Sequence, residues 1–182
     1  MNTTKISLKS LKEVTSYISR GITPSYDEFE GIPVINQRCI RNNTIDFSNV
    51  RLTNPSKKKI NKDKYLQEWD VLVNSTGVGT LGRSAQIKEI TSEITVDSHV
   101  TILRPNSLVD PLFFGYSVQY SKKLIEGLAE GSTGQTELSR VRIGEEILIP
   151  IHSLKNQEKI GKILSRIDKK ISINNKINQN LN

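Results

Sequence analysis

The apolar positions of the C-terminal segment, residues 154–182, recur in alternating steps of four and three. This spacing is typical of a coiled-coil seam, and the segment has no Pro and a single Gly, Gly161. The pattern predicts one amphipathic helix about 40 Å long, at a rise of 1.5 Å per residue. The predicted oligomerisation seam runs through Ile160, Leu164, Ile167, Ile171, Asn174, Asn178 and Leu181. The alternative is a terminal helix that packs on its own domain.

The residues before this segment mix helical and strand patterns. Leu8, Leu11, Val14 and Ile18 have helical spacing and predict a helix over 7–20 with Ser7 as its N-cap. A second helix is predicted over 109–128, with Pro111 in its first turn. Apolar and β-branched runs predict strands at 32–36, 70–74, 84–88 and 147–151, and a strand or bulged pair at 93–104.

This irregular order of elements predicts an α+β fold with a β-rich core and flanking helices. We expect residues 1–151 to form one globular domain and residues 152–182 to form the long helix that follows it. The chain of 182 residues is long enough for one such domain and its appendage.

The formal net charge of +7 is concentrated in the C-terminal segment. Seven Lys and Arg residues lie after residue 153, against Glu158 and Asp168, which leaves only a small excess of positive charge on the globular part. A basic chain suggests a polyanionic partner. Because the globular part is nearly balanced, nucleic-acid binding there has to depend on local patches.

Compartment signals are few. A single cysteine, Cys39, excludes an internal disulfide framework and fits a reducing compartment. The N-terminus lacks the apolar core of a signal peptide, and no apolar run reaches membrane-spanning length. We expect a cytoplasmic protein with no membrane partner.

Residues 77–82 match the pattern G-x-G-x-x-G and follow a predicted strand. A dinucleotide-binding fold needs a helix directly after the third glycine, whereas strand-like residues follow Gly82 here. A polar loop that joins two strands is therefore the better interpretation, and a nucleotide-binding enzyme is the alternative. Asp110-Pro111 faintly resembles part of a methyltransferase motif, but the start of a helix explains it.

No pattern predicts a catalytic centre or a metal site, since His99, His152 and Cys39 lack metal-ligand spacing. Several polar loops instead offer the side chains that read base edges and bind phosphates. The predicted DNA contacts are Asn36, Arg38, Arg41, Asn42, Lys57, Lys58, Lys59, Asn74, Ser75, Thr76, Arg83, Ser132, Thr133, Gln135 and Arg140. A protein-interaction module that binds no DNA is the other alternative.

Several stretches, taken in order, resemble the specificity subunit of type I restriction–modification systems. They are 21–24 (GITP), 31–35 (GIPVI), 70–77 (DVLVNSTG), 131–135 (GSTGQ), 147–150 (ILIP) and 156–168 (NQEKIGKILSRID). The resemblance covers almost the whole chain and is to one target recognition domain followed by one spacer helix. Asn156-Gln157 departs from the Glu-Gln that the family often has before this helix.

The resemblance implies a non-catalytic reader of double-stranded DNA. It implies partners as well: a methyltransferase subunit that carries S-adenosylmethionine, a restriction subunit, and a second unit bound through the helix. Full specificity subunits resemble two such units in tandem. This chain is therefore expected to be a half-subunit that forms a homodimer, a fragment of a longer subunit, or a remnant without function.

Overall fold

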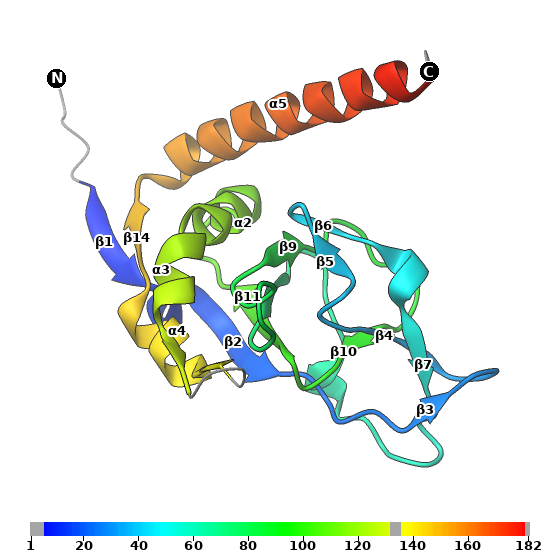
Figure 1. Cartoon of the computed structure of the whole chain (residues 1–182). Helices are drawn as coiled ribbons and strands as arrows, with labels where there is room; N and C mark the ends of the chain where they lie inside the picture. The colour runs from blue at the N-terminus through cyan, green and yellow to red at the C-terminus, as the bar shows by residue number, and fades with distance from the viewer. Residues whose placement is uncertain (1–5, 132–135, 181–182) are drawn as a thin grey trace, which may run out of the picture.

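The computed structural model describes residues 6–131 and 136–180 and has the predicted α+β fold (Figure 1). Its central sheet is antiparallel, with the strand order β2-β11-β8-β9. These strands are β2 (Thr15–Arg20), β11 (Val100–Pro105), β8 (Val71–Asn74) and β9 (Ser84–Gln86). The predictions of strands at 70–74 and 84–88 are confirmed.

A second sheet has the order β10-β4-β7-β3, and its strands are shorter. They are β10 (Thr95–Val96), β4 (Ile32–Ile35), β7 (Arg51–Thr53) and β3 (Tyr26–Asp27). Residues 93–104, which were predicted to be one strand or a bulged pair, thus divide between two sheets. The chain crosses over at a turn where the amide of Val100 donates to the carbonyl of Asp97.

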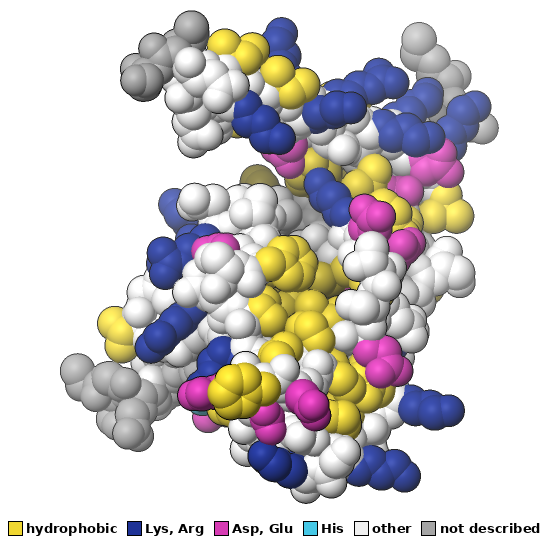
Figure 2. Space-filling view, turned by 90° about the vertical axis from the view of Figure 1, so that its right-hand side faces the viewer, with side chains coloured by type: hydrophobic (Ala, Val, Ile, Leu, Met, Phe, Trp, Pro, Cys, Tyr) yellow, Lys and Arg dark blue, Asp and Glu magenta, His cyan; other side chains and the backbone are white. Residues whose placement is uncertain are grey.

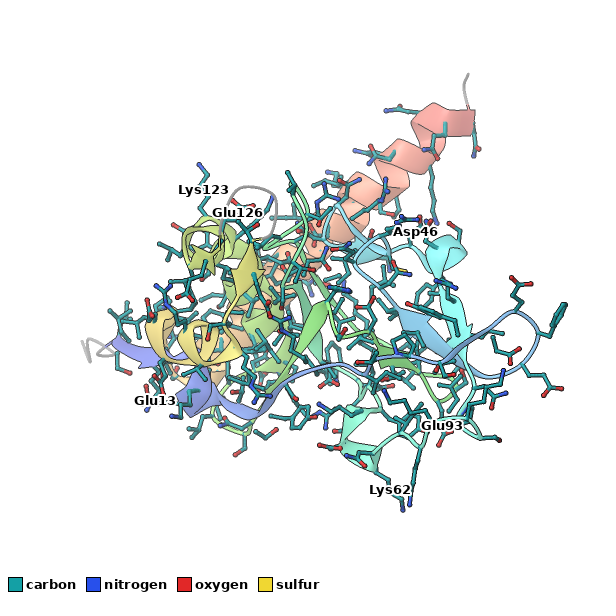
Figure 3. All side chains as sticks on the ribbon, turned by 60° about the horizontal axis from the view of Figure 1, so that its bottom comes forward. Glu13, Asp46, Lys62, Glu93, Lys123 and Glu126 are labelled. Atoms are coloured by element: carbon teal, nitrogen blue, oxygen red, sulfur yellow. The ribbon has the colours of Figure 1, made fainter. Side chains whose placement is uncertain are left out.

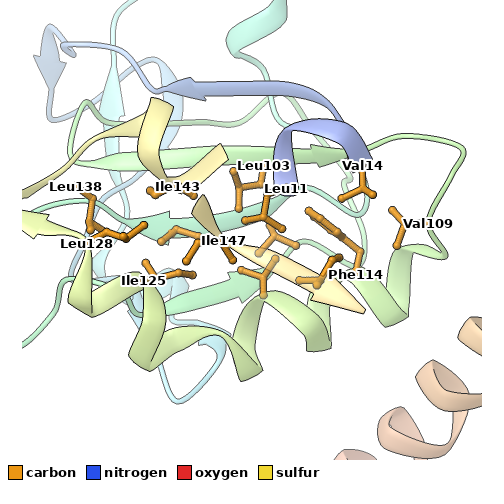
Figure 4. Packing of buried hydrophobic residues seen from close by; sticks show 14 of the residues in the cluster. Leu11, Val14, Leu103, Val109, Phe114, Ile125, Leu128, Leu138, Ile143 and Ile147 are labelled. Carbon is orange, nitrogen blue, oxygen red and sulfur yellow. The ribbon is translucent and has the colours of Figure 1, made fainter. Parts of the chain in front are cut away.

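Helices cover the central sheet on the side where the larger core lies. They are α2 (Pro111–Tyr120), α3 (Lys122–Gly127) and α4 (Arg140–Glu146). Leu11, Leu103, Phe114, Ile125 and Ile143, from five different elements, meet in this core, and each is fully buried (Figure 4). Each such side chain contributes roughly 1.5–3 kcal/mol of burial free energy.

The predicted helix over 7–20 is wrong. The chain forms strand β1 (Ser7–Ser10), one helical turn, α1 (Leu11–Val14), and then β2. Ser10 rather than Ser7 caps the turn, because its side chain accepts from the amide of Glu13 and the Glu13 side chain accepts from the amide of Ser10. Strand β1 is held by β14 (Leu148–Ile151), a partner far away in the sequence.

The second predicted helix is confirmed but divides at Ser121 into α2 and α3. Asp110 caps α2, and its carboxylate accepts from the amide of Phe113 at 2.9 Å, as expected of a helix start. Helix α4 was not predicted, and it ends just before the strand predicted at 147–151, which the structure has as β14.

Short elements complete the domain and support the loops of the candidate site. They are β5 (Ile40–Arg41), β6 (Thr44–Ile45), η1 (Phe47–Asn49), η2 (Lys62–Lys64), β12 (Ala129–Glu130) and β13 (Glu137–Leu138). Strands β5 and β6 form a two-residue hairpin, and β12 pairs with β13.

The long C-terminal helix is confirmed as α5 (Leu154–Asn180), which starts against α2 and then extends away from the domain (Figure 1). Gln157 is buried where the helix starts: its Oε1 accepts from the amide of Asp110, and its Nε2 donates to the carbonyl of His152, both at 2.8 Å. Gly161 is also buried and packs against Leu112. Beyond it, the hydroxyl of Tyr116 donates to Asp168 at 2.6 Å.

The distal part of α5 leaves its isoleucines uncovered. Ile163, Ile167 and Ile171 are 55%, 50% and 52% exposed, and Ile173 and Ile177 are similarly open. Ile160 is the member of the predicted seam that packs against the core, while Leu164 is half-buried. The helix is therefore not folded into its own domain along its length. Leu181 lies outside the described residues.

We predict that Gly161→Val lowers the free energy of unfolding by about 1–3 kcal/mol, because a Cβ there would lie 2.9 Å from the Cβ of Leu112 and 3.0 Å from the amide nitrogen of Phe113. Urea denaturation measures the change. Gly127→Val is the matched control, since a Cβ at Gly127 meets nothing within 4 Å. Equal effects of the two substitutions would contradict this account of the α2–α5 contact.

Candidate nucleic-acid interface

Three loops and strand β13, all distant in the sequence, meet around Thr76. We call Gln37, Thr76, Arg83, His99 and Glu137 the Thr76 cluster. The hydroxyl Oγ1 of Thr76 lies 2.9 Å from Nδ1 of His99 and 3.4 Å from Oε1 of Gln37. Thr76 also forms an isolated antiparallel bridge with Glu137. The cluster thus joins the β4–β5, β8–β9 and β10–β11 connections to strand β13 at one end of the central sheet.

The glycine-rich loop 77–82 joins the antiparallel strands β8 and β9. Gly77, Gly79 and Gly82 all have positive φ, a backbone conformation that residues with a Cβ rarely adopt. A Cβ at Gly77 would lie 2.5 Å from Oε1 of Gln37, so glycine also allows the loops to pack closely. A strand and not a helix follows the third glycine, so the predicted strand-joining loop is confirmed and the dinucleotide fold is contradicted.

Three of the predicted contacts are buried and hold the loops instead of facing outward. Asn74 and Ser75 are fully buried and Asn36 is 9% exposed. Nδ2 of Asn74 donates to the carbonyl of Gln37 at 3.0 Å, and Nδ2 of Asn36 donates to the carbonyl of Asn49 at 2.9 Å. Direct contact of these three side chains with DNA is therefore corrected to a positioning role.

A buried carboxylate supports the exposed His99. Asp97 is 5% exposed, and its Oδ1 accepts from the amide of His99 at 2.9 Å. Burial raises the pKa of Asp97 above its ordinary value, and the hydrogen bond from the His99 amide opposes that rise. His99 and Glu137 were not among the predicted contacts, because no local pattern shows that these segments meet.

Arg20 and Arg140 lie beside the cluster along an open groove that also includes Ser98 and Leu138. The Arg20 guanidinium pairs with Glu137 at 2.8 Å and donates to the carbonyl of Leu138 at 2.6 Å. Arg140, at the start of α4, is exposed and has no side-chain hydrogen bond or ion pair with the described residues. Its guanidinium is therefore available to a ligand.

Arg38, Arg41 and Asn42 follow the β5–β6 hairpin away from the cluster. Arg38, at its base, is exposed and makes no side-chain bond with the described residues, while Nε of Arg41 donates to the carbonyl of Arg38 at 3.1 Å. Asn42 and Asn43 form the tip with φ of 50° and 58°, values that Asn tolerates. The hairpin lies on the same side of the domain as Asp46, whereas Lys62 projects from the opposite side (Figure 3).

The predicted lysine run lies apart from these loops. Lys57 pairs with Asp27 of β3 at 3.0 Å, and Lys58 donates to the carbonyl of Thr23 at 3.0 Å. Lys59 is exposed. The loop after β7 lies at the bottom of Figure 1, away from α5. Ser132, Thr133 and Gln135 lie outside the described residues.

Within residues 6–131 and 136–180, no three His, Cys, Asp or Glu side chains gather as a metal ion would require. None of the helices in that described part is long and apolar enough to cross a membrane.

We predict that Asn74→Ala costs about 1–3 kcal/mol of stability, because it leaves the carbonyl of Gln37 without its buried donor. The measurement is equilibrium urea denaturation. Asn61→Ala serves as the control, since Asn61 is exposed and makes no capping bond with its side chain. An unchanged midpoint for Asn74→Ala would show that this bond does not hold the loops together.

Comparison with solved structures shows what fold this is. The specificity subunit of a type I system from M. genitalium matches with a TM-score of 0.65 and 17% identity over 94% of this chain and 41% of that one. The HsdS subunit from Thermoanaerobacter tengcongensis matches with a TM-score of 0.66 and 16% identity over 92% and 38%. A structure that describes complex assembly and conformational transition of the type I system matches with a TM-score of 0.68 and 16% identity over 92% of this chain and 39% of that one. The chain spans about two fifths of the length of these chains.

A family model described as "Type I restriction modification DNA specificity domain" matches residues 4–182, which is nearly the whole chain. The specificity family is the DNA-recognition component of such systems and not the catalytic one. This agrees with a site made of polar loops on a β-rich domain that precedes a long helix. The chain therefore belongs to the type I restriction–modification DNA specificity family.

Proposed function

We propose that this chain reads one half of a bipartite DNA target within a type I restriction–modification complex. The observation that carries the proposal is the Thr76 cluster, where three loops and strand β13 meet beside Arg38 and Arg140, whose guanidinium groups pair with none of the described residues. Base reading requires side chains held in place before the DNA arrives, and buried Asn74 and Ser75 provide that support.

The exposed side chains suit different parts of this task. Arg38 and Arg140 can each donate two parallel hydrogen bonds to O6 and N7 of a guanine in the major groove. Thr76 and His99 can bind base edges or phosphates at the centre of the cluster. Arg83 donates to the carbonyl of Gly79 at 2.8 Å, so it stabilises the glycine loop as well as adding positive charge.

The exposed stripe of α5 supports a second part of the proposal. Ile163, Ile167 and Ile171 repeat every four residues, and this spacing suits packing against another helix. A partner helix would come from a second copy or from a second unit of the same architecture. A helix of about 40 Å would separate two recognition domains by about one DNA turn, which is roughly 34–36 Å. The predicted division into residues 1–151 and 152–182 remains part of this proposal.

The family to which the chain belongs suggests the remaining partners. A methyltransferase subunit that holds S-adenosylmethionine would modify the recognised DNA, and a restriction subunit would join the complex. We propose that α5 and the helical side of the domain dock the methyltransferase subunit, because apolar residues such as Tyr120, Leu124 and Leu148 are exposed there.

We predict that Arg38→Ala and Arg140→Ala each weaken binding of the preferred duplex by about 1–3 kcal/mol and relax the preference at one base position. The complex of this chain with its methyltransferase subunit first selects duplexes from a random-sequence pool. Competition binding then compares the selected duplex with single-base variants.

Arg51→Ala is the matched control for this experiment. Arg51 is exposed, but its guanidinium is occupied, because it stacks over the Tyr26 ring of the second sheet at 3.4 Å from the ring centroid. It should leave the sequence preference unchanged. If both cluster variants keep their affinity and their preference at every position, these side chains do not read DNA.

We predict that Ile167→Glu weakens self-association of the chain by at least about tenfold, because burial of an isoleucine is worth roughly 1.5–3 kcal/mol and a carboxylate would replace it. Sedimentation equilibrium over a range of concentrations measures the change. Ser172→Glu adds the same charge on another face of α5 and should have little effect. An unaltered chain that stays monomeric at micromolar concentration would contradict the homodimer.

A further inference from the structure

A polar cavity of about 740 Å³ separates the distal half of α5 from the body of the domain. We call it the α5 groove. The tip of the β5–β6 hairpin, the residues after β9 and one side of α2 form its domain wall, and α5 forms the other wall. Its lining includes Asn42, Lys88, Gln119, Asp168, Lys169 and Lys176.

The side of α5 that faces this groove is polar. Ser165, Lys169, Ser172 and Lys176 lie on it at helical spacing, and Ile171 lies at its edge. The proximal part of α5 packs on the domain through apolar contacts around Gly161. A distal helix that packed on the domain in the same way would carry apolar residues on this side. The groove therefore has the chemistry of a surface for a polar ligand.

The net charge of the lining is positive. Lys88, Lys169 and Lys176 form no ion pair with any described residue, whereas the acid Asp168 is bound by the hydroxyl of Tyr116 at 2.6 Å. Burial and, after it, that hydrogen bond raise the pKa of Tyr116, so the tyrosine stays a neutral donor. Figure 2 shows the Lys and Arg side chains that gather along the helix above the body of the molecule.

The hairpin connects the groove to the Thr76 cluster. The residues at its base contact the cluster through Gln37, and its tip, Asn42, lines the groove. Strand β9 makes the same connection, since Arg83 precedes it and Lys88 follows it. A ligand long enough to touch both places would pass the exposed arginines Arg38 and Arg41 on the way.

We propose that the α5 groove binds the sugar–phosphate backbone of the DNA whose bases the Thr76 cluster reads. Lys88, Lys169 and Lys176 would neutralise phosphates, and the amides of Asn42 and Gln119 would donate hydrogen bonds to phosphate oxygens. Such contacts position the duplex without regard to sequence. This inference rests on the proposed function and adds a second contact region to it.

The test is a double variant, Lys169→Gln with Lys176→Gln, in the complex with the methyltransferase subunit. Binding to the selected duplex and to a scrambled duplex is measured at several salt concentrations. Loss of two phosphate contacts should weaken binding of both duplexes by roughly tenfold and reduce the salt-dependence slope by about 2. The sequence preference should stay the same.

The matched control is Lys155→Gln with Lys159→Gln, which removes two positive charges from the same helix outside the groove. The salt-dependence slope of this control should change by clearly less than that of the groove variant. Three outcomes would each overturn the groove proposal alone. The two double variants could have equal effects, the base preference could change, or the groove variant could lose the methyltransferase subunit while its DNA binding stays intact. Failure of the unaltered complex to prefer any duplex would instead overturn the proposed function.

Discussion

The placement of α5 depends on its contact with α2, which begins where the two helices start. Gln157 bridges the amide of Asp110 and the carbonyl of His152 with its own buried amide, and Gly161 lets the two helices approach closely. A buried amide with both ends bonded is costly to displace, because each lost bond leaves a polar group unpaired. Together with the hydrogen bond from Tyr116 to Asp168 further along, this contact sets the direction of the helix, so its proximal half positions the exposed stripe.

The Thr76 cluster depends on a similar use of buried polar groups. The hydroxyls of Ser75 and Thr101 lie 2.6 Å apart inside the sheet, and the amide of Ser75 donates to the carbonyl of His99. Asn74 adds the bond to Gln37. Because these anchors are inside the fold, the exposed side chains above them start from fixed positions, which lowers the entropy cost of binding.

The sequence predicted well the features that depend on local periodicity. The seam spacing of α5 and the apolar run of β8 each identify their element from a local pattern alone. The helix predicted over 7–20 failed because β1 and β2 are held by β14 and β11, which are far away in the sequence and override a helical spacing. The loops of the candidate site were found as separate polar segments. That Asn74 is buried while His99 is exposed follows only from the way those loops pack.

The two proposals assign different contacts to α5, and helical geometry places those contacts on different sides of the helix. With 3.6 residues per turn, Ile163 and Ile167 lie on one side and Lys169 and Lys176 turn toward the domain, while Ile171 lies at the boundary between the two sides. A partner helix on the apolar side would leave the groove open, and a DNA backbone in the groove would leave the apolar side free. Because one rigid element carries both surfaces, the contact at Gln157 would set the spacing between recognition domains and the path of the DNA together.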